Sequence, residues 1–149
     1  MKENIEISNL LMDIPTVLCR NISQRFVSTI LKEIKSEFSK HHFMILKLLS
    51  ENKKLYITEI VQTLGITKPQ MTVSIDKLIS LGFVVRKNDI KDRRKIYLKI
   101  TKSGRKINNT IKQEINSKIN ENLIQFSESE IDQLENGLKI LYKFCTIYK

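Results

Sequence analysis

The chain has 149 residues, of which 41% are hydrophobic and 28% are charged, and this length is enough for one domain with a real core. That balance excludes an intrinsically disordered chain, and no apolar run approaches the roughly 20 residues that cross a bilayer. The net charge is +10 and is concentrated in one part of the chain. Residues 53–106 hold fourteen basic and four acidic residues, whereas the charges of the remaining sequence cancel. Such a basic segment is typical of a surface that binds phosphate groups.

The N-terminal sequence M-K-E-N is mixed in charge and lacks the features of a signal peptide, so we expect a cytoplasmic protein. Two cysteines, Cys19 and Cys145, fit no metal or redox spacing and are expected to be buried thiols. We find no nucleophile–base arrangement, glycine-rich phosphate loop or pair of carboxylates that predicts an enzyme, and we expect no cofactor.

The first third of the chain is predicted to be helical. Residues 5–36 place apolar side chains three or four positions apart, which is the helical spacing. Pro15 either kinks this helix or marks its start, with Asp13 as the cap. A second helix follows at residues 39–49 with its first residue, a serine, as the N-cap. Residues 55–57 are expected to add a short strand.

Two short helices joined by a tight turn follow. The first is predicted to begin after Thr58 as N-cap and to end at Gly65, because glycine readily takes the left-handed conformation of a helix end. Thr67 caps the second helix, and Gln70 completes a capping box. Gly82 ends this helix. Two helices in this arrangement indicate a helix-turn-helix.

A basic hairpin is predicted directly after the helix pair. The apolar runs at residues 83–85 and 96–98 flank the charged sequence I-K-D-R-R-K at residues 90–95. Two strands joined by a cationic turn are suited to contact a polyanion. A helix-turn-helix followed by a basic hairpin is the layout of a winged helix-turn-helix, which points to double-stranded DNA.

The sequence after residue 101 predicts two further helices. The first carries isoleucines at strict four-residue spacing, and Ser127 with Glu130 forms a capping box before the second. These helices have more apolar surface than each could leave exposed, so we expect them to pack as a bundle within one chain or between two. We favour two chains, because a dimer reads two half-sites of DNA.

The predicted fold class is therefore mainly α with a small β-hairpin wing. A single domain spans residues 1–149, with a winged helix-turn-helix lobe at residues 39–104. Residues 1–38 and 105–149 are expected to be dimerisation helices on either side of it.

This order of elements resembles the MarR family of bacterial transcription regulators. The resemblance is carried by I-T-E-I-V-Q-T-L-G-I-T at residues 57–67, M-T-V-S-I-D-K-L-I-S-L-G at 71–82 and F-V-V-R-K-N-D-I-K-D-R-R-K-I-Y-L-K-I-T-K-S-G at 83–104. It implies a homodimer that acts as a ligand-responsive repressor on a pseudo-palindromic operator. The chain departs from the family at Val61, where a small alanine is usual.

The second helix of the pair is the candidate recognition helix. Its outward face is predicted to offer Lys68, Gln70, Thr72, Val73, Ser74 and Lys77. An exposed Val73 suits contact with a thymine methyl group, and Gln70 could read adenine. The alternative interpretation is that these are ordinary solvated residues.

Four basic residues of the hairpin complete the predicted DNA-binding set: Lys91, Arg93, Arg94 and Lys95. Arg93 and its lysine neighbours would serve the minor groove or flanking phosphates. The resemblance implies that Arg94 braces the wing by pairing with Asp76, although a plain exposed acid is an equally good interpretation of Asp76.

The resemblance also implies a small aromatic or anionic effector bound near Arg20, His42, Phe43 and Arg86. Each arginine taken alone also fits a surface ion pair. Cys19 leaves open a redox-sensing regulator of the same family, although an inert buried thiol is the favoured interpretation. No metal site is expected, because the helix at residues 105–125 has no histidine to join His41 and His42. A further alternative is a winged-helix module that binds an acidic protein partner.

Overall fold

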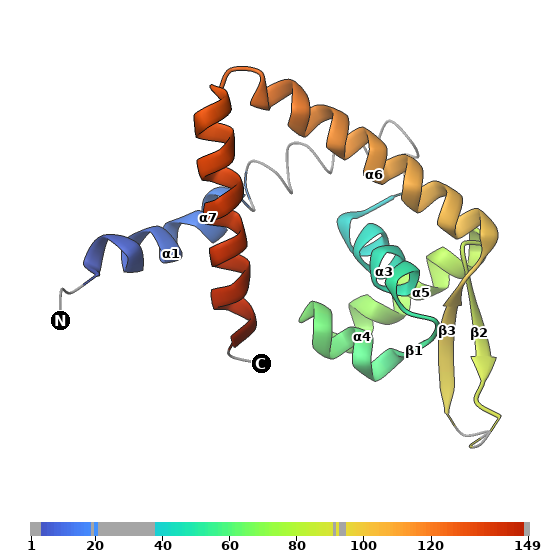
Figure 1. Cartoon of the computed structure of the whole chain (residues 1–149). Helices are drawn as coiled ribbons and strands as arrows, with labels where there is room; N and C mark the ends of the chain where they lie inside the picture. Colours follow the sequence, from blue (N-terminus) through green and yellow to red (C-terminus); the bar gives the residue numbers. More distant parts are fainter. Residues whose placement is uncertain (1–3, 19, 21–37, 91, 93–94, 148–149) are drawn as a thin grey trace. The chain divides into compact units, whose positions relative to one another are not determined.

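Figure 1 shows the computed structural model of the chain, which describes residues 4–18, 20, 38–90, 92 and 95–147. The described elements are α1 (Ile5–Leu18), α3 (Lys40–Glu51), β1 (Leu55–Tyr56), α4 (Ile57–Leu64), α5 (Lys68–Ser80), β2 (Val84–Asn88), β3 (Ile96–Ile100), α6 (Lys102–Leu123) and α7 (Glu128–Ile147). The chain forms two compact units, residues 1–115 and 116–149. The fold is mainly helical with one small sheet, so the predicted fold class is confirmed.

The sheet has three antiparallel strands in the order β1-β3-β2. Strands β2 and β3 are the predicted hairpin, with Val84 opposite Ile100 and Asn88 opposite Ile96. The short strand predicted at residues 55–57 is present as β1, and Leu55 lies opposite Leu98 of β3. The hairpin is therefore paired on its β3 edge with the segment that precedes the helix-turn-helix.

Helix α1 continues through Pro15, so Pro15 does not begin a helix capped by Asp13. The helix starts ten residues earlier, at Ile5, and none of its residues is buried. The remainder of the predicted N-terminal helix, residues 21–36, lies outside the described residues, as does Cys19.

Of the N-caps predicted at Ser39, Thr58 and Thr67, two are confirmed and one is wrong. Ser39 and Thr67 occupy the N-caps of α3 and α5 and take part in capping boxes. Helix α4 begins at Ile57, ahead of the predicted cap Thr58. Tyr56 is the N-cap residue, and its backbone N–H donates to Glu59 Oε2 at 2.7 Å. The helix begins there because Tyr56 is held in strand β1, so helical geometry starts at the next residue.

The hydrophobic core of the first unit lies between α3, α4, α5, the sheet and the start of α6. Its fully buried side chains are Ile45, Leu46, Leu49, Ile60, Met71, Ile75, Leu78, Val84, Leu98 and Ile111. Val61 packs against this core partly buried, so the chain accommodates the larger side chain at that position. The core fixes the helix-turn-helix and the hairpin as one body.

The second unit holds the end of α6 and all of α7. The predicted capping box is confirmed, since Ser127 N–H donates to Glu130 Oε2 at 2.8 Å and Glu130 N–H donates to Ser127 Oγ at 3.3 Å. The Ser127 hydroxyl also donates to Glu130 Oε2, at 2.7 Å, and this bond, followed by the one from the Ser127 N–H, lowers the pKa of Glu130. No residue of α7 is buried. Cys145 is therefore exposed in the single chain, and its prediction as a buried thiol is wrong, because the apolar stripe on which it lies is uncovered.

Within the described residues, no helix combines the length and the apolar character needed to cross a membrane.

Candidate nucleic-acid interface

Helix α5 begins with a strong local signal. Gln70 N–H donates to Thr67 Oγ1 at 3.5 Å, Thr67 N–H donates to Gln70 Oε1 at 3.4 Å, and Pro69 lies in the first turn. The capping box uses the N–H groups of Thr67 and Gln70, and Pro69 has none, so an attraction for phosphate at this exposed helix start would come from the helix dipole and from Lys68. Helix α5 contacts α3 and β2 and is oriented by the core.

One face of α5 is buried, and it includes a residue that was predicted to face outward. Met71, Ile75 and Leu78 pack in the core, and Ser74 is only 7% exposed among them. Ser74 lies three residues after Met71 and four before Leu78, so helical periodicity places it on the same stripe. Its predicted outward position is wrong.

The opposite face of α5 carries Lys68, Gln70, Thr72, Val73 and Asp76, all exposed, with Lys77 partly buried at its edge. Val73 is 71% exposed, as predicted. Thr72 Oγ1 donates to Lys68 O at 3.0 Å. Gln70 Oε1 accepts a hydrogen bond from Thr67 Oγ1 at 3.0 Å, so the helix cap already uses the oxygen of the Gln70 carboxamide. Bidentate contact with adenine would therefore require Gln70 to leave its capping position.

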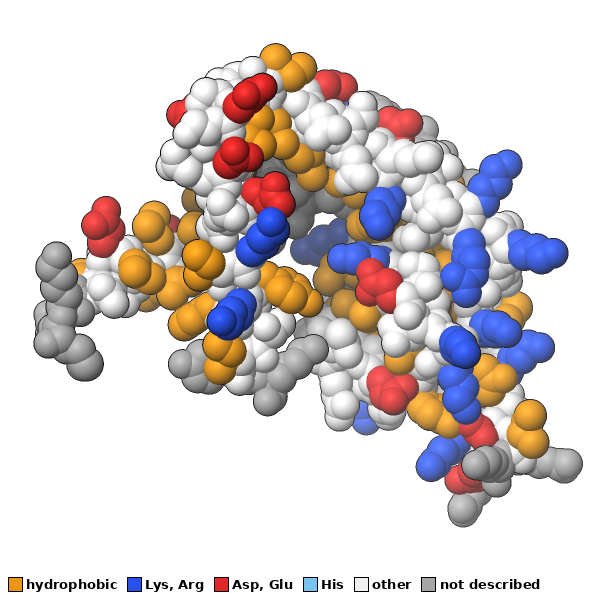
Figure 2. Space-filling view, in the orientation of Figure 1, with side chains coloured by type: hydrophobic (Ala, Val, Ile, Leu, Met, Phe, Trp, Pro, Cys, Tyr) orange, Lys and Arg blue, Asp and Glu red, His pale blue; other side chains and the backbone are white. Residues whose placement is uncertain are grey.

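Basic side chains gather over β2, β3 and the beginning of α6 (Figure 2). The exposed members of this group are Arg86, Lys87, Lys95, Lys99, Lys102, Arg105 and Lys106. Lys91, Arg93 and Arg94 lie outside the described residues. A positive surface of this kind beside an exposed helix face is suited to the DNA backbone.

Asp76 joins α5 to the hairpin. Arg86 Nη2 donates to Asp76 Oδ1 at 2.7 Å, and both side chains are about half exposed. The predicted partner of Asp76 was Arg94, which lies outside the described residues. Arg86 was assigned instead to effector binding. Sequence reasoning missed this pair because the two residues are ten positions apart and on different elements.

A second contact between segments lies at the far end of β2. Asp89 is 7% exposed, and its Oδ2 accepts hydrogen bonds from Lys54 Nζ at 2.8 Å and Tyr56 Oη at 2.5 Å. The Lys54 ammonium also lies over the ring of Tyr97, 5.1 Å from its centroid. We call Lys54, Tyr56, Asp89 and Tyr97 the wing-base cluster. The hydrogen bond to Asp89 is the main cause that raises the pKa of Lys54 and that of Tyr56.

Two pockets flank the wing-base cluster. One, of about 400 Å³, is lined by Lys54, Tyr56, Asp89, Ile90, Asp92, Lys95 and Tyr97. The other, of about 510 Å³, is lined by Tyr56, Ile57, Thr58, Glu59, Lys95 and Ile96. None of the four residues predicted to bind an effector lines either pocket.

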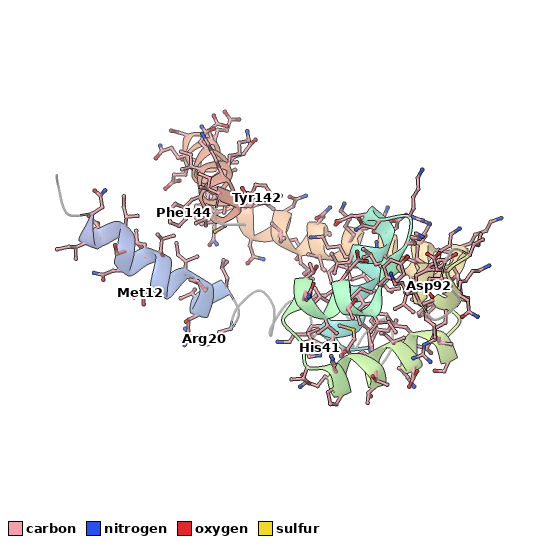
Figure 3. All side chains as sticks on the ribbon, turned by 90° about the horizontal axis from the view of Figure 1, so that it is seen from below. Met12, Arg20, His41, Asp92, Tyr142 and Phe144 are labelled. Carbon is pink, nitrogen blue, oxygen red and sulfur yellow. The ribbon has the colours of Figure 1, made fainter. Side chains whose placement is uncertain are left out.

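Two of those four residues have structural contacts in α3. His42 is buried, its Nδ1 accepts a hydrogen bond from Ser39 N–H at 3.0 Å, and its ring lies 5.3 Å from that of Phe38. Burial, followed by the nearby charges of His41 and Lys77, lowers the pKa of His42. Phe43 packs partly buried against the core. Arg20 is exposed beyond the end of α1 (Figure 3).

Among the described residues, no group of three or more His, Cys, Asp or Glu could hold a metal ion.

Residues 36–95 match the sequence model of the MarR family. The HTH-type transcriptional repressor YetL of Bacillus subtilis is 30% identical over 113 residues, which cover 74% of this chain and 68% of YetL. A MarR family protein from Bacillus stearothermophilus has a similar fold, with a TM-score of 0.81 and 20% identity over 98% of this chain and 99% of that one. Streptococcus pneumoniae FabT, solved in complex with DNA, has a TM-score of 0.70 and 23% identity over 99% of this chain and all of its own. The chain belongs to the MarR family and is therefore a helix-turn-helix, DNA-binding transcription regulator, not an enzyme.

Proposed function

We propose that the protein represses transcription as a homodimer bound to a pseudo-palindromic operator, and that a small aromatic or anionic effector releases it. The observation that carries this proposal is the exposed Val73 on the polar face of α5, beside a hairpin that holds much of the excess positive charge. An apolar side chain that is 71% exposed on such a face is suited to a thymine methyl group in the major groove.

The proposed DNA contacts fall into two groups. On α5, Lys68 and Lys77 approach phosphates, and Thr72 and Val73 approach base edges, while Gln70 contributes its side-chain amide group beside the cap. Ser74 takes no part, because it is buried. In the wing, Lys91, Arg93, Arg94 and Lys95 lie at the minor groove or at flanking phosphates.

The proposal of a homodimer is supported by the uncovered apolar surface of α7. Leu134 and Leu138 are 45% and 52% exposed, and Tyr142 is 74% exposed on the same helix. Figure 3 shows Tyr142 and Phe144 on α7 and Met12 on α1, two helices without a buried residue. Apolar surface of this extent marks an interface. A second copy of the chain is the fitting partner, because a two-fold dimer presents two recognition helices to two half-sites.

The proposed sign of regulation is supported by the relative YetL, which is described as a transcriptional repressor. For the effector, the structure favours a narrower set of residues than the sequence did. Arg86 is paired with Asp76, and His42 is used by the helix cap, so neither is available without breaking a contact. Arg20 is exposed and stays the candidate for binding an anionic group.

The test begins with selection of bound DNA from a random pool. We expect a two-fold symmetric site, and an affinity that falls about 10³–10⁵-fold between roughly 50 and 200 mM salt if the dimer makes about 6–10 phosphate contacts. Equal binding to every DNA in the pool, or an affinity independent of salt, would contradict the proposal.

Val73→Ser then tests the base contact on the selected site. Removing the valine methyl groups should weaken binding about fivefold, since an apolar contact of this size contributes about 1 kcal/mol. The control is made in the DNA, by replacing each thymine with uracil, which lacks the methyl group. At the contacted thymine, uracil should weaken the wild type and leave Val73→Ser unchanged. If no thymine behaves in this way, Val73 does not read the base.

A further inference from the structure

Asp89 is the one buried acid among the described residues. A carboxylate taken out of water is unstable unless charged or hydrogen-bonding groups replace the lost solvent. Lys54 supplies the charge and Tyr56 supplies a hydroxyl, and both donate to Oδ2 of Asp89. Neither donor is close to Asp89 in the sequence, since they are 35 and 33 residues away. The carboxylate therefore holds together two segments of chain that meet only in the folded lobe.

The two segments belong to different parts of the DNA-binding machinery. Lys54 and Tyr56 lie in and beside β1, directly before α4 and the rest of the helix-turn-helix. Asp89 directly follows β2, and its N–H donates to Lys95 O at 2.9 Å, which closes the hairpin beyond its last ladder pair. Tyr97 of β3 lies opposite Tyr56, with the ring centroids 6.5 Å apart and nearly perpendicular. The cluster thus joins the distal part of the hairpin to the base of the helix pair.

The hairpin is held at a second point by the pair of Asp76 and Arg86. That pair is about half exposed on both sides, so solvent and salt screen it. In the pair of Lys54 and Asp89 the lysine is also half exposed, but the carboxylate is buried, so its contacts are screened less than those between two half-exposed groups. The wing-base cluster is therefore the firmer of the two attachments, and it lies nearer the basic turn that would contact DNA.

We propose that the wing-base cluster is a positioning device, which fixes the angle between the hairpin and the helix-turn-helix so that both reach the operator together. In this proposal Asp89 does not contact DNA and acts through the hairpin that it holds. The inference rests on the proposed function, because a positioned wing matters only if wing and helix bind one operator.

Two variants with the same change in charge test this proposal. Asp89→Ala and Asp89→Asn each remove one negative charge, which by long-range attraction alone would tighten binding to DNA equally. Only asparagine keeps an oxygen that accepts from Lys54 and Tyr56. We expect Asp89→Ala to bind the operator about tenfold more weakly than Asp89→Asn, if the wing then occupies its competent position in roughly one tenth of the molecules.

A second readout distinguishes wing position from general stability. Loss of wing contacts should reduce the slope of log affinity against log salt by about one for each lost phosphate contact. Amide hydrogen exchange of residues 84–88 and 95–100 should accelerate in Asp89→Ala, while that of the buried part of α5 stays unchanged. A uniform rise in exchange over the whole lobe would mean a loss of stability without a specific effect on the wing, and would overturn the proposal.

If Asp89→Ala does not fold, Tyr56→Phe decides the question, because it removes one donor to Asp89 without changing the charge at neutral pH. Its control is Tyr97→Phe, which keeps the ring that packs against Tyr56 and Lys54. We expect Tyr56→Phe to weaken operator binding and Tyr97→Phe to bind nearly as the wild type does. Equal affinities for Asp89→Ala, Asp89→Asn and the wild type would overturn this inference and leave the proposed function in place. A wild type that shows no operator preference would instead remove the proposed function on which the inference depends.

Discussion

At the scale of single residues, Gly104 shows how tightly α6 approaches the hairpin. A Cβ atom at this position would lie 2.1 Å from Phe83 O and 2.8 Å from Ile100 Cγ1. The same carbonyl of Phe83 accepts a hydrogen bond from Thr101 N–H at 3.0 Å, and Thr101 Oγ1 accepts one from Gly104 N–H at 3.0 Å. The first turn of α6 is therefore held against the backbone that enters β2, and the space for a side chain is absent.

We predict that Gly104→Ala destabilises the folded protein by about 1–3 kcal/mol, because a backbone oxygen must move to make room. The sign of this change in stability is informative, because in a helix without such a close contact alanine is favoured over glycine by about 1 kcal/mol. Asn109→Ala is the control, as Asn109 is exposed on the same helix. Urea unfolding followed by circular dichroism would measure both. A Gly104→Ala variant as stable as Asn109→Ala would show that the close approach has no energetic consequence.

Single residues also show which signals a sequence carries. The capping boxes at Thr67 and Ser127 were predictable because both partners lie within four residues. The outward position of Ser74 was predicted wrongly, because its polar side chain was given more weight than its spacing from Met71 and Leu78, which places it on the buried stripe. Asp89 was missed as a structural residue since its partners are more than thirty residues away, where neither periodicity nor local spacing is informative.

At the scale of elements, the order of helices and the hairpin was predictable because hydrophobic periodicity and turn residues are local properties. The pairing of β1 with β3 shifted the start of α4, and a pairing over more than forty positions in the sequence, such as Leu55 with Leu98, has no local signature. Helix α3 illustrates an element whose start depends on ionisation. Its capping box uses His42, whose Nδ1 accepts a hydrogen bond from Ser39 N–H and must be unprotonated to do so.

We predict that the protein loses stability as the pH falls below the ordinary histidine value. Burial lowers the pKa of His42 from 6.5 in the folded state, so below pH 6.5 the unfolded chain takes up a proton that the folded chain resists. The contribution of neutral His42 to the free energy of unfolding is therefore fully present above the unfolded-state pKa. It is lost as the pH falls through the folded-state pKa. Thermal unfolding at a series of pH values from about 7.5 to 5 covers this window.

His42→Gln is the matched variant, because glutamine also completes a capping box and does not titrate. It should lose less stability than the wild type over the same interval of pH. The carboxyls of Glu130 and Glu135 do not confuse the comparison, since hydrogen bonds lower each pKa from 4.5 and place their titration below this window. Identical pH dependence in the two proteins would show that His42 does not control the stability of α3.

At the scale of the whole molecule, the apolar surface is distributed unevenly. The winged helix-turn-helix lobe has a closed core, whereas one stripe of α7 carries Leu134, Leu138 and Tyr142 with about half or more of each side chain exposed. A chain in this state would aggregate or associate, because a contiguous apolar face of a soluble protein is stable only when it is covered. The same stripe was predictable from its helical spacing, but whether a second copy covers it depends on association, which no property of one chain determines.

A charge placed in this face distinguishes a dimer from a monomer, because it is harmless on a solvated surface and disruptive in a buried interface. In a monomer, Leu138→Glu replaces a half-exposed leucine by a solvated carboxylate and should leave the fold unchanged or improve its solubility. In a dimer, it buries an unpaired charge in the interface, so we predict dissociation to a folded monomer. The monomer would bind only one half-site, and operator affinity should fall about 10²-fold or more.

Asn136→Glu adds the same charge to an exposed position on the other side of α7 and should remain dimeric with normal affinity. Sedimentation equilibrium and operator titration of the three proteins measure both properties. If Leu138→Glu keeps the mass and the affinity of the wild type, α7 does not form the interface through which two recognition helices reach one operator.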